Sequence, residues 1–177
     1  RMLGDAYEVG NFGRPSATLL AHGHMPYFQQ AEWNAAKAFT ADIAVVHLGI
    51  NDTDPRNWPN YRDEFVTDYL HLIDTLRQVN PQVRILIARL TPIRHDHHRF
   101  TSGTKLWHDE IQEAIETVAR VAGVELIDFH APLYHHPDYS VEGIHPNPAG
   151  ARLLALTAYS GITGNYGGLR MSPPHTD

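Results

Sequence analysis

Short, continuous apolar runs recur along the chain and are separated by longer stretches with a different periodicity. The runs predict β-strands that are covered on both faces, because a strand with one wet face alternates polar and apolar residues. Three of them occupy residues 43–48, 83–90 and 124–129. A shorter strand is predicted at residues 7–11, where Gly13 follows as a closing turn residue.

The stretches between these runs carry apolar residues at helical spacing, three or four positions apart. Such a stripe predicts a helix that packs one face against the sheet. The first stripe consists of Phe65, Tyr69, Leu72, Ile73 and Leu76, and the second of Trp107, Ile111, Ala114, Ile115 and Val118. Asn80-Pro81 and Gly123 follow them, at the places where helix-stopping residues are expected. A last apolar helix is predicted from Ala151 onward.

This alternation of strands and helices predicts an α/β domain with a parallel sheet, because right-handed crossovers place the helices on both faces. We expect a three-layer α/β/α sandwich over residues 1–160 and an extended tail, rich in Gly and Pro, over residues 161–177. Ligands of such sheets bind beyond the carboxyl ends of the strands. Chemistry is therefore expected at Gly13, at residues 49–52 and 91–98, and after Phe129.

The composition fits one globular core and narrows the classes of partner. The 177 residues are 42% hydrophobic and 19% charged, with a formal net charge of -6. Without a basic run, neither nucleic acid nor an anionic membrane surface is favoured, and no segment approaches the roughly 20 apolar residues of a membrane span. The absence of cysteine excludes disulfides and thiolate chemistry. No signal peptide is visible, so a periplasmic or secreted location is expected only if an upstream segment carries one.

The segment His47-Leu48-Gly49-Ile50-Asn51-Asp52 stands at the end of the most apolar predicted strand. A glycine there lets the backbone turn and approach a ligand, and the Asn51 carboxamide offers an NH2 donor to a developing oxyanion. Because Gly, Asn and Asp also favour turns for conformational reasons, a plain strand-ending turn is the alternative.

A second motif, Glu142-Gly143-Ile144-His145-Pro146-Asn147, precedes the last predicted helix. An acid three residues before a histidine can hold the imidazole through Nδ1 and leave Nε2 as a general base. The alternative is that His145 only packs against the helix start. Gly13 can present a backbone N–H to the same oxyanion, although a turn glycine is the alternative reading there.

In this order, the three motifs resemble the SGNH hydrolase superfamily, whose members are also called GDSL esterases. The resemblance covers nearly the whole chain and implies a flavodoxin-like SGNH fold and ester hydrolysis without cofactor or metal. It implies that Gly13 and Asn51 are oxyanion donors, that His145 is the catalytic base and that Glu142 orients it. The family usually has Asp where this sequence has Glu142.

The nucleophile block of that family, Gly-Asp-Ser on the first strand, is missing from the sequence. Gly4-Asp5-Ala6 looks like this block with Ala in place of Ser, but no apolar strand precedes it and Gly13 follows too soon for an intervening helix. None of the five serines lies in a nucleophile elbow: they are Ser16, Ser102, Ser140, Ser160 and Ser172. The residues after Ser16 predict a helix that Ser16 caps. We therefore expect the first strand and its serine on an upstream segment or a partner chain.

The run Arg94-His95-Asp96-His97-His98-Arg99 is a candidate zinc site. A structural zinc site needs about four ligands, and adjacent positions on one loop seldom point at one ion. We therefore expect a polar rim of a substrate cleft and no metal. Trp58, Trp107 and Tyr134 are candidate stacking platforms for sugar rings, with simple packing as the alternative.

The residues from Asn51 to Trp58 resemble SGNH esterases of polysaccharide degradation and sialate O-acetylesterases more than lipases. The resemblance implies a serine esterase that removes O-acetyl groups from plant oligosaccharides or sialate-type sugars, with Asp52, Trp58 and His95 near the acetylated carbohydrate. A lysophospholipase or thioesterase of the same superfamily is one alternative. A non-catalytic carbohydrate-binding fragment is the other.

Overall fold

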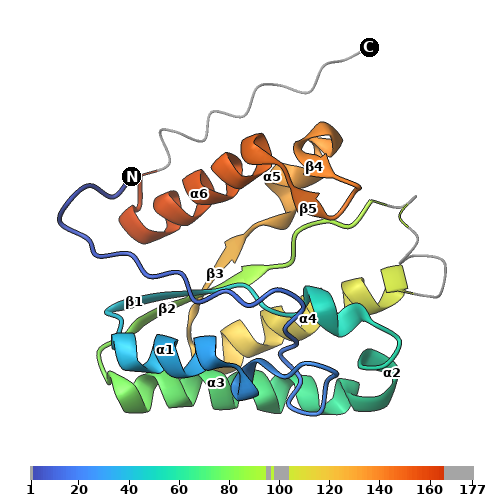
Figure 1. The fold of residues 1–177 in the computed structure, drawn as a ribbon, viewed down its shortest axis with the longest axis horizontal. Coiled ribbons are helices and arrows are strands. Elements are labelled where there is room, and N and C mark those ends of the chain that lie inside the picture. Colours follow the sequence, from blue (N-terminus) through green and yellow to red (C-terminus); the bar gives the residue numbers. More distant parts are fainter. Residues whose placement is uncertain (1, 95–96, 98–103, 166–177) are drawn as a thin grey trace.

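The computed structural model describes residues 2–94, 97 and 104–165 (Figure 1). Three parallel strands form the central sheet in chain order: β1 (Ile43–Val46), β2 (Arg84–Arg89) and β3 (Glu125–Asp128). In the register, Val45 lies opposite Leu86, and Ile87 lies opposite Leu126. These strands confirm three of the four predicted runs, each one or two residues shorter at its ends.

Helices cover both faces of this sheet (Figure 1). One face carries α1 (Ala31–Phe39), α3 (Phe65–Val79) and α4 (Thr104–Ala122), and the other carries α6 (Pro148–Thr163). The larger core fills the first face with completely buried side chains that include Phe65, Tyr69, Leu72, Ile111 and Ile115. The smaller core lies under α6 and consists of Leu86, Ala88, Ile127 and Phe129, packed by Leu154, Ala158 and Ile162. The predicted three-layer α/β architecture is confirmed.

The two helices predicted from apolar stripes end where the sequence predicted. α3 ends at Val79, directly before Asn80, and α4 ends at Ala122, before Gly123 with its φ of 62°. The last helix begins three residues earlier than predicted, at Pro148, because Asn147 caps it. It also continues to Thr163, into the segment predicted as an extended tail. Residues 166–177 of that tail lie outside the described residues.

Short elements complete the chain and connect the layers. They are the 3-10 helices η1 (Tyr27–Gln29), η2 (Ile50–Thr53), η3 (Arg62–Glu64) and η5 (Pro137–Tyr139), the helices α2 (Trp58–Tyr61) and α5 (His130–Tyr134), and the antiparallel pair β4 (Ser140–Val141) and β5 (His145–Pro146). Among the described residues, no helix has the length and apolar character that a membrane crossing requires.

The N-terminal segment is where the sequence predictions fail. Residues 7–11 form no strand: Val9 is 75% exposed and the segment pairs with no strand of the sheet. Ser16 begins no helix, because it lies in a turn with a left-handed φ of 65°. Residue Thr18 instead forms an isolated bridge with Pro26. This segment owes its shape to contacts with distant parts of the chain, which a local pattern does not carry.

Candidate active site

Gly49 turns the chain sharply where β1 ends and thereby places Asn51 at the carboxyl edge of the sheet. Its φ of 124° is one that side chains rarely adopt, and a Cβ there would lie 3.2 Å from side-chain atoms of both Ile111 and Leu90. Only glycine meets both conditions at this position. The turn continues as η2, which carries Asn51 and Asp52.

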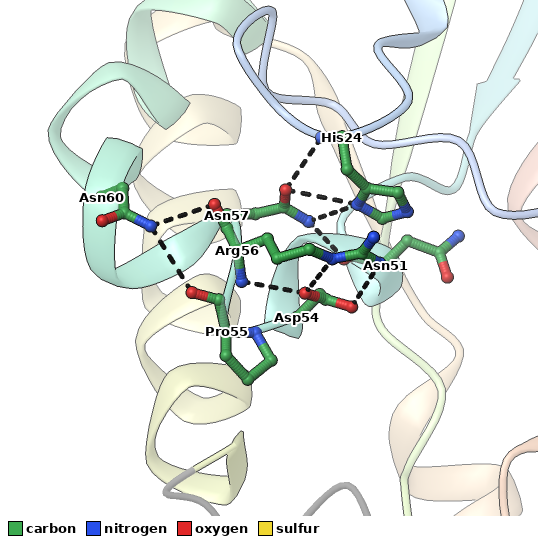
Figure 2. A network of polar contacts seen from close by, with 7 residues as sticks. All are labelled: His24, Asn51, Asp54, Pro55, Arg56, Asn57 and Asn60. Atoms are coloured by element: carbon green, nitrogen blue, oxygen red, sulfur yellow. Dashed lines mark hydrogen bonds and ion pairs between the residues drawn. The ribbon is translucent and has the colours of Figure 1, made fainter.

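Asn51 is held from two sides, and Figure 2 shows the side that faces Asn57. Its Nδ2 donates to the carbonyl oxygen of Ala17 at 3.0 Å. Its backbone carbonyl oxygen accepts from Nδ2 of Asn57 at 2.9 Å. Asn57 is completely buried, and its Oδ1 also accepts from the backbone N–H of His24 at 2.9 Å. Figure 2 shows the Asn51 side chain pointing away from this cluster. Because a carboxamide has two N–H bonds, one hydrogen of Nδ2 remains for a substrate oxygen.

Asp52 and Trp58, both predicted to lie near the substrate, are buried instead. The exposed fraction is 0% for Asp52 and 3% for Trp58. The carboxylate of Asp52 accepts from the backbone N–H groups of Leu19 and Leu20, both at 2.9 Å. Trp58 donates through Nε1 to Glu110. Neither side chain offers a surface to a sugar in this structure, and the third predicted residue, His95, lies outside the described residues.

His145 and Glu142 form a hydrogen-bonded pair on the β4–β5 hairpin. Nδ1 of His145 contacts Oε1 of Glu142, and both side chains are exposed. This contact leaves Nε2 directed to the surroundings, as a general base requires. The hairpin is tied to the chain that follows β2, because Arg94 N–H donates to the carbonyl of Gly143 at 2.8 Å. Figure 1 shows the hairpin and η2 on the side of the sheet where β1 and β2 end.

Gly13, the other predicted oxyanion donor, uses its N–H within its own loop. That N–H donates to Oδ1 of Asn11 at 3.0 Å, which closes a small turn. The loop is anchored by Tyr27, whose hydroxyl donates to the carbonyl of Phe12 at 2.8 Å. The amide of Gly13 would have to exchange Asn11 for a substrate oxygen in order to act as an oxyanion donor.

Three histidines to which the sequence analysis assigned no role lie along the same edge of the sheet. Burial lowers the pKa of His47 to about 4, and Thr91 N–H approaches its Nε2 at 3.4 Å. Nε2 of His108 contacts the carbonyl of Thr91 at 3.0 Å, and the His130 ring lies 5.8 Å from that of His108. Burial also lowers the pKa of both His108 and His130. Within the described part of the chain, no three metal-binding side chains gather into one site.

Of the candidate sugar platforms, Tyr134 is exposed and Trp107 is not. Tyr134 is 65% exposed and stacks on the ring of His130 at 5.4 Å. Trp107 packs against the larger core.

The buried positions of Asn57 and Asp52 explain why they were missed as supports of Asn51, since neither forms a recognisable motif with its distant partners.

Comparisons with known proteins identify relatives of this chain. Residues 1–153 match the GDSL-like Lipase/Acylhydrolase family. An acetylxylan esterase from Xylanibacter ruminicola is 35% identical over an alignment of 172 residues, and the match covers 87% of this chain and 35% of that protein. The chain therefore spans about a third of the length of that curated relative.

Solved structures confirm the predicted SGNH hydrolase fold. A carbohydrate esterase of family 3 from Talaromyces cellulolyticus matches with a TM-score of 0.59 at 18% identity, over 77% of this chain and 65% of that one. A catalytic mutant of an acetylxylan esterase from Geobacillus stearothermophilus matches with a TM-score of 0.58 at 18% identity, over 77% of this chain and 66% of that one. At this identity the likeness concerns the fold.

Proposed function

The chain belongs to the GDSL-like lipase/acylhydrolase family of carboxylic ester hydrolases, and we propose that it removes O-acetyl groups from xylan or a related carbohydrate. The relative from Xylanibacter ruminicola supports the acetylated polysaccharide as substrate class. The observation that carries the proposal is the His145–Glu142 pair, held on a hairpin that is bonded to the chain after β2.

In the proposed reaction, Nε2 of His145 takes the proton of a serine hydroxyl as its oxygen attacks the acetyl carbon. Glu142 holds Nδ1 and balances the positive charge of the imidazolium. The second N–H of the Asn51 carboxamide, together with the Gly13 amide, stabilises the oxyanion. His145 returns the proton to the sugar oxygen as the ester bond breaks, and a water molecule then releases acetate from the serine by the same steps.

We place the nucleophilic serine outside these 177 residues. The three described serines fit the role poorly: Ser160 is 1% exposed inside α6, Ser140 Oγ donates to the Pro137 carbonyl, and Ser16 lies in the turn after Gly13. β1 is an outer strand of the three-stranded sheet, and β2 is its one partner among the described residues. A strand on an upstream segment or partner chain would bring a serine to the edge that carries Asn51.

Labelling tests the assignment of the nucleophile. A fluorophosphonate probe should modify one serine of the intact natural protein, and mass spectrometry should map it to a Gly-Asp-Ser peptide outside residues 1–177. Ser16→Ala is the matched control and should leave labelling unchanged. Labelling that disappears in Ser16→Ala would place the nucleophile within the chain and overturn this part of the proposal.

Product analysis tests the substrate class. The intact protein should release acetate from acetylated xylo-oligosaccharides faster than it turns over acyl-thioesters or lysophospholipids. The reverse order of rates would favour the lysophospholipase or thioesterase alternative. Sugar binding without labelling or acetate release would favour a non-catalytic carbohydrate-binding role.

A further inference from the structure

A short strap, Ala17–Ala21, crosses over the turn that carries Asn51. Its backbone N–H groups point to carboxylates from distant parts of the chain: Leu19 and Leu20 donate to Asp52 at 2.9 Å, and Ala21 donates to Asp68 at 2.8 Å. Leu19, Leu20 and Asp52 are all completely buried. Hydrogen bonds to a carboxylate in such a place are stronger than neutral ones, because one partner is charged and water does not compete.

The same strap also determines where the Asn51 side chain points. The carbonyl oxygen of Ala17 accepts from Asn51 Nδ2 at 3.0 Å. Two neighbouring residues thus bind the strap: Asn51 through its carboxamide and Asp52 through its carboxylate. The backbone of Asp52 is itself fixed, because its N–H donates to the carbonyl of Gly49 at 3.1 Å. Any movement of the strap away from Asp52 would carry the Ala17 carbonyl with it and release the carboxamide.

We propose that Asp52 is a positioning residue: by clamping the strap, it holds the Asn51 carboxamide in the orientation that an oxyanion donor needs. The inference rests on the proposed esterase function for its catalytic meaning, although the clamp itself is a property of the fold. It gives Asp52 a role without contact to substrate.

The surroundings of Asp52 make the clamp sensitive to mild acid. The groups facing its carboxyl are the N–H groups of Leu19 and Leu20, its own N–H, the carboxylate of Asp68 and the buried hydroxyl of Tyr69. Burial, together with the charge of Asp68, raises its pKa to about 6 despite the three N–H donors. A protonated carboxyl group has less acceptor capacity for two N–H donors, so the clamp should loosen below this pH.

Nuclear magnetic resonance on the intact protein tests the clamp without any assay of activity. The amide signals of Leu19 and Leu20 and the carboxamide signals of Asn51 should shift together between pH 4.5 and 7.5, with one common midpoint near 6. Asp52→Asn should abolish this joint titration. Asp54→Asn is the matched control, because Asp54 follows the same turn but pairs with the exposed Arg56; it should leave the titration in place. Carboxamide signals of Asn51 that ignore both pH and Asp52→Asn would overturn the proposal.

Kinetics of the intact protein test the catalytic consequence. Asp52→Asn should lower kcat for acetate release by roughly tenfold or more with KM changed less than about twofold, because misplacing a catalytic group costs turnover more than binding. If Asp52 acts through Asn51, the double variant should lose no more kcat than Asn51→Ala alone. An unchanged kcat in Asp52→Asn overturns the proposal. A wild type without esterase activity whose signals still titrate jointly would instead contradict the proposed function and leave the clamp intact.

Discussion

At the scale of single residues, the acid beside His145 occupies a backbone conformation that few side chains adopt. Glu142 has a φ of 40°, and the next residue, Gly143, has a φ of 84°. A Cβ on Gly143 would lie 2.9 Å from Cβ of Arg94, so this glycine also permits the hairpin to approach the chain after β2. The left-handed pair bends the loop back so that the longer Glu side chain reaches Nδ1 of His145.

Glu142→Gln should reduce turnover without removing the side chain. Gln has the same shape but no charge, so it cannot balance the imidazolium that forms when His145 takes a proton. We expect kcat for acetate release by the intact protein to fall roughly tenfold or more. The control is Glu113→Gln on the exposed side of α4, which should keep wild-type kcat. Equal rates for Glu142→Gln and the wild type would show that another group orients His145.

At the scale of elements, α6 joins the smaller core to the hairpin that carries His145. Asn147 stands directly before the helix, and its Oδ1 accepts from the N–H groups of Ala149 and Gly150 at 3.0 and 3.1 Å. Its Nδ2 donates to the carbonyl of Asp138 at 2.8 Å, which ties the helix start to η5. A Cβ at Gly150 would lie 2.4 Å from the Tyr139 carbonyl oxygen, so the helix start is packed closely here.

Asn147→Ala should destabilise the fold by about 1 kcal/mol, because the first-turn N–H groups of α6 lose their cap. Urea unfolding followed by circular dichroism measures the change. Asn147→Asp keeps the capping oxygen and loses the bond to Asp138, so it separates the cap from the tie to η5. We expect it to retain most of the wild-type stability. An Ala variant as stable as the wild type would show that water satisfies these N–H groups equally well.

The elements also show what the sequence could and could not predict. β1, β2, β3, α3 and α4 were predictable because their apolar patterns are local and their ends carry ordinary stop signals. The strap was not, because its shape depends on Asp52 and Asp68, more than thirty residues away in the sequence. The predicted strand at residues 7–11 failed for a related reason: a strand needs a paired neighbour, which local sequence does not reveal.

At the scale of the whole molecule, the order of the motifs along the chain was enough to predict the family. The surroundings of the site residues became visible only in the structure. The turn after β1 and the His145 hairpin were visible as motifs because the residues of each lie within a few positions of one another in the sequence. The burial of Asp52 and Trp58 follows from packing between distant segments, which no motif reveals. The same packing buries His108 and partly buries His47 and His130 at one edge of the sheet, and it lowers the pKa of all three, which couples the stability of the fold to pH.

His47 provides the sharpest test of that coupling. Burial lowers its pKa from 6.5 to about 4 in the folded state, so between these pH values the unfolded chain binds more protons and stability falls as pH falls. Asp52 acts in the opposite direction, because its raised pKa favours the protonated folded state in mild acid. Comparing His47→Gln with the wild type cancels the Asp52 contribution. Relative to the variant, the wild type should lose about 2 kcal/mol of unfolding free energy between pH 7.5 and 5, measured by urea titration at each pH.

His135→Gln, at an exposed position, is the control and should follow the wild-type curve. Parallel curves for His47→Gln and the wild type would mean that His47 titrates alike in the folded and unfolded chain, and burial at this edge would then not govern the response to acid.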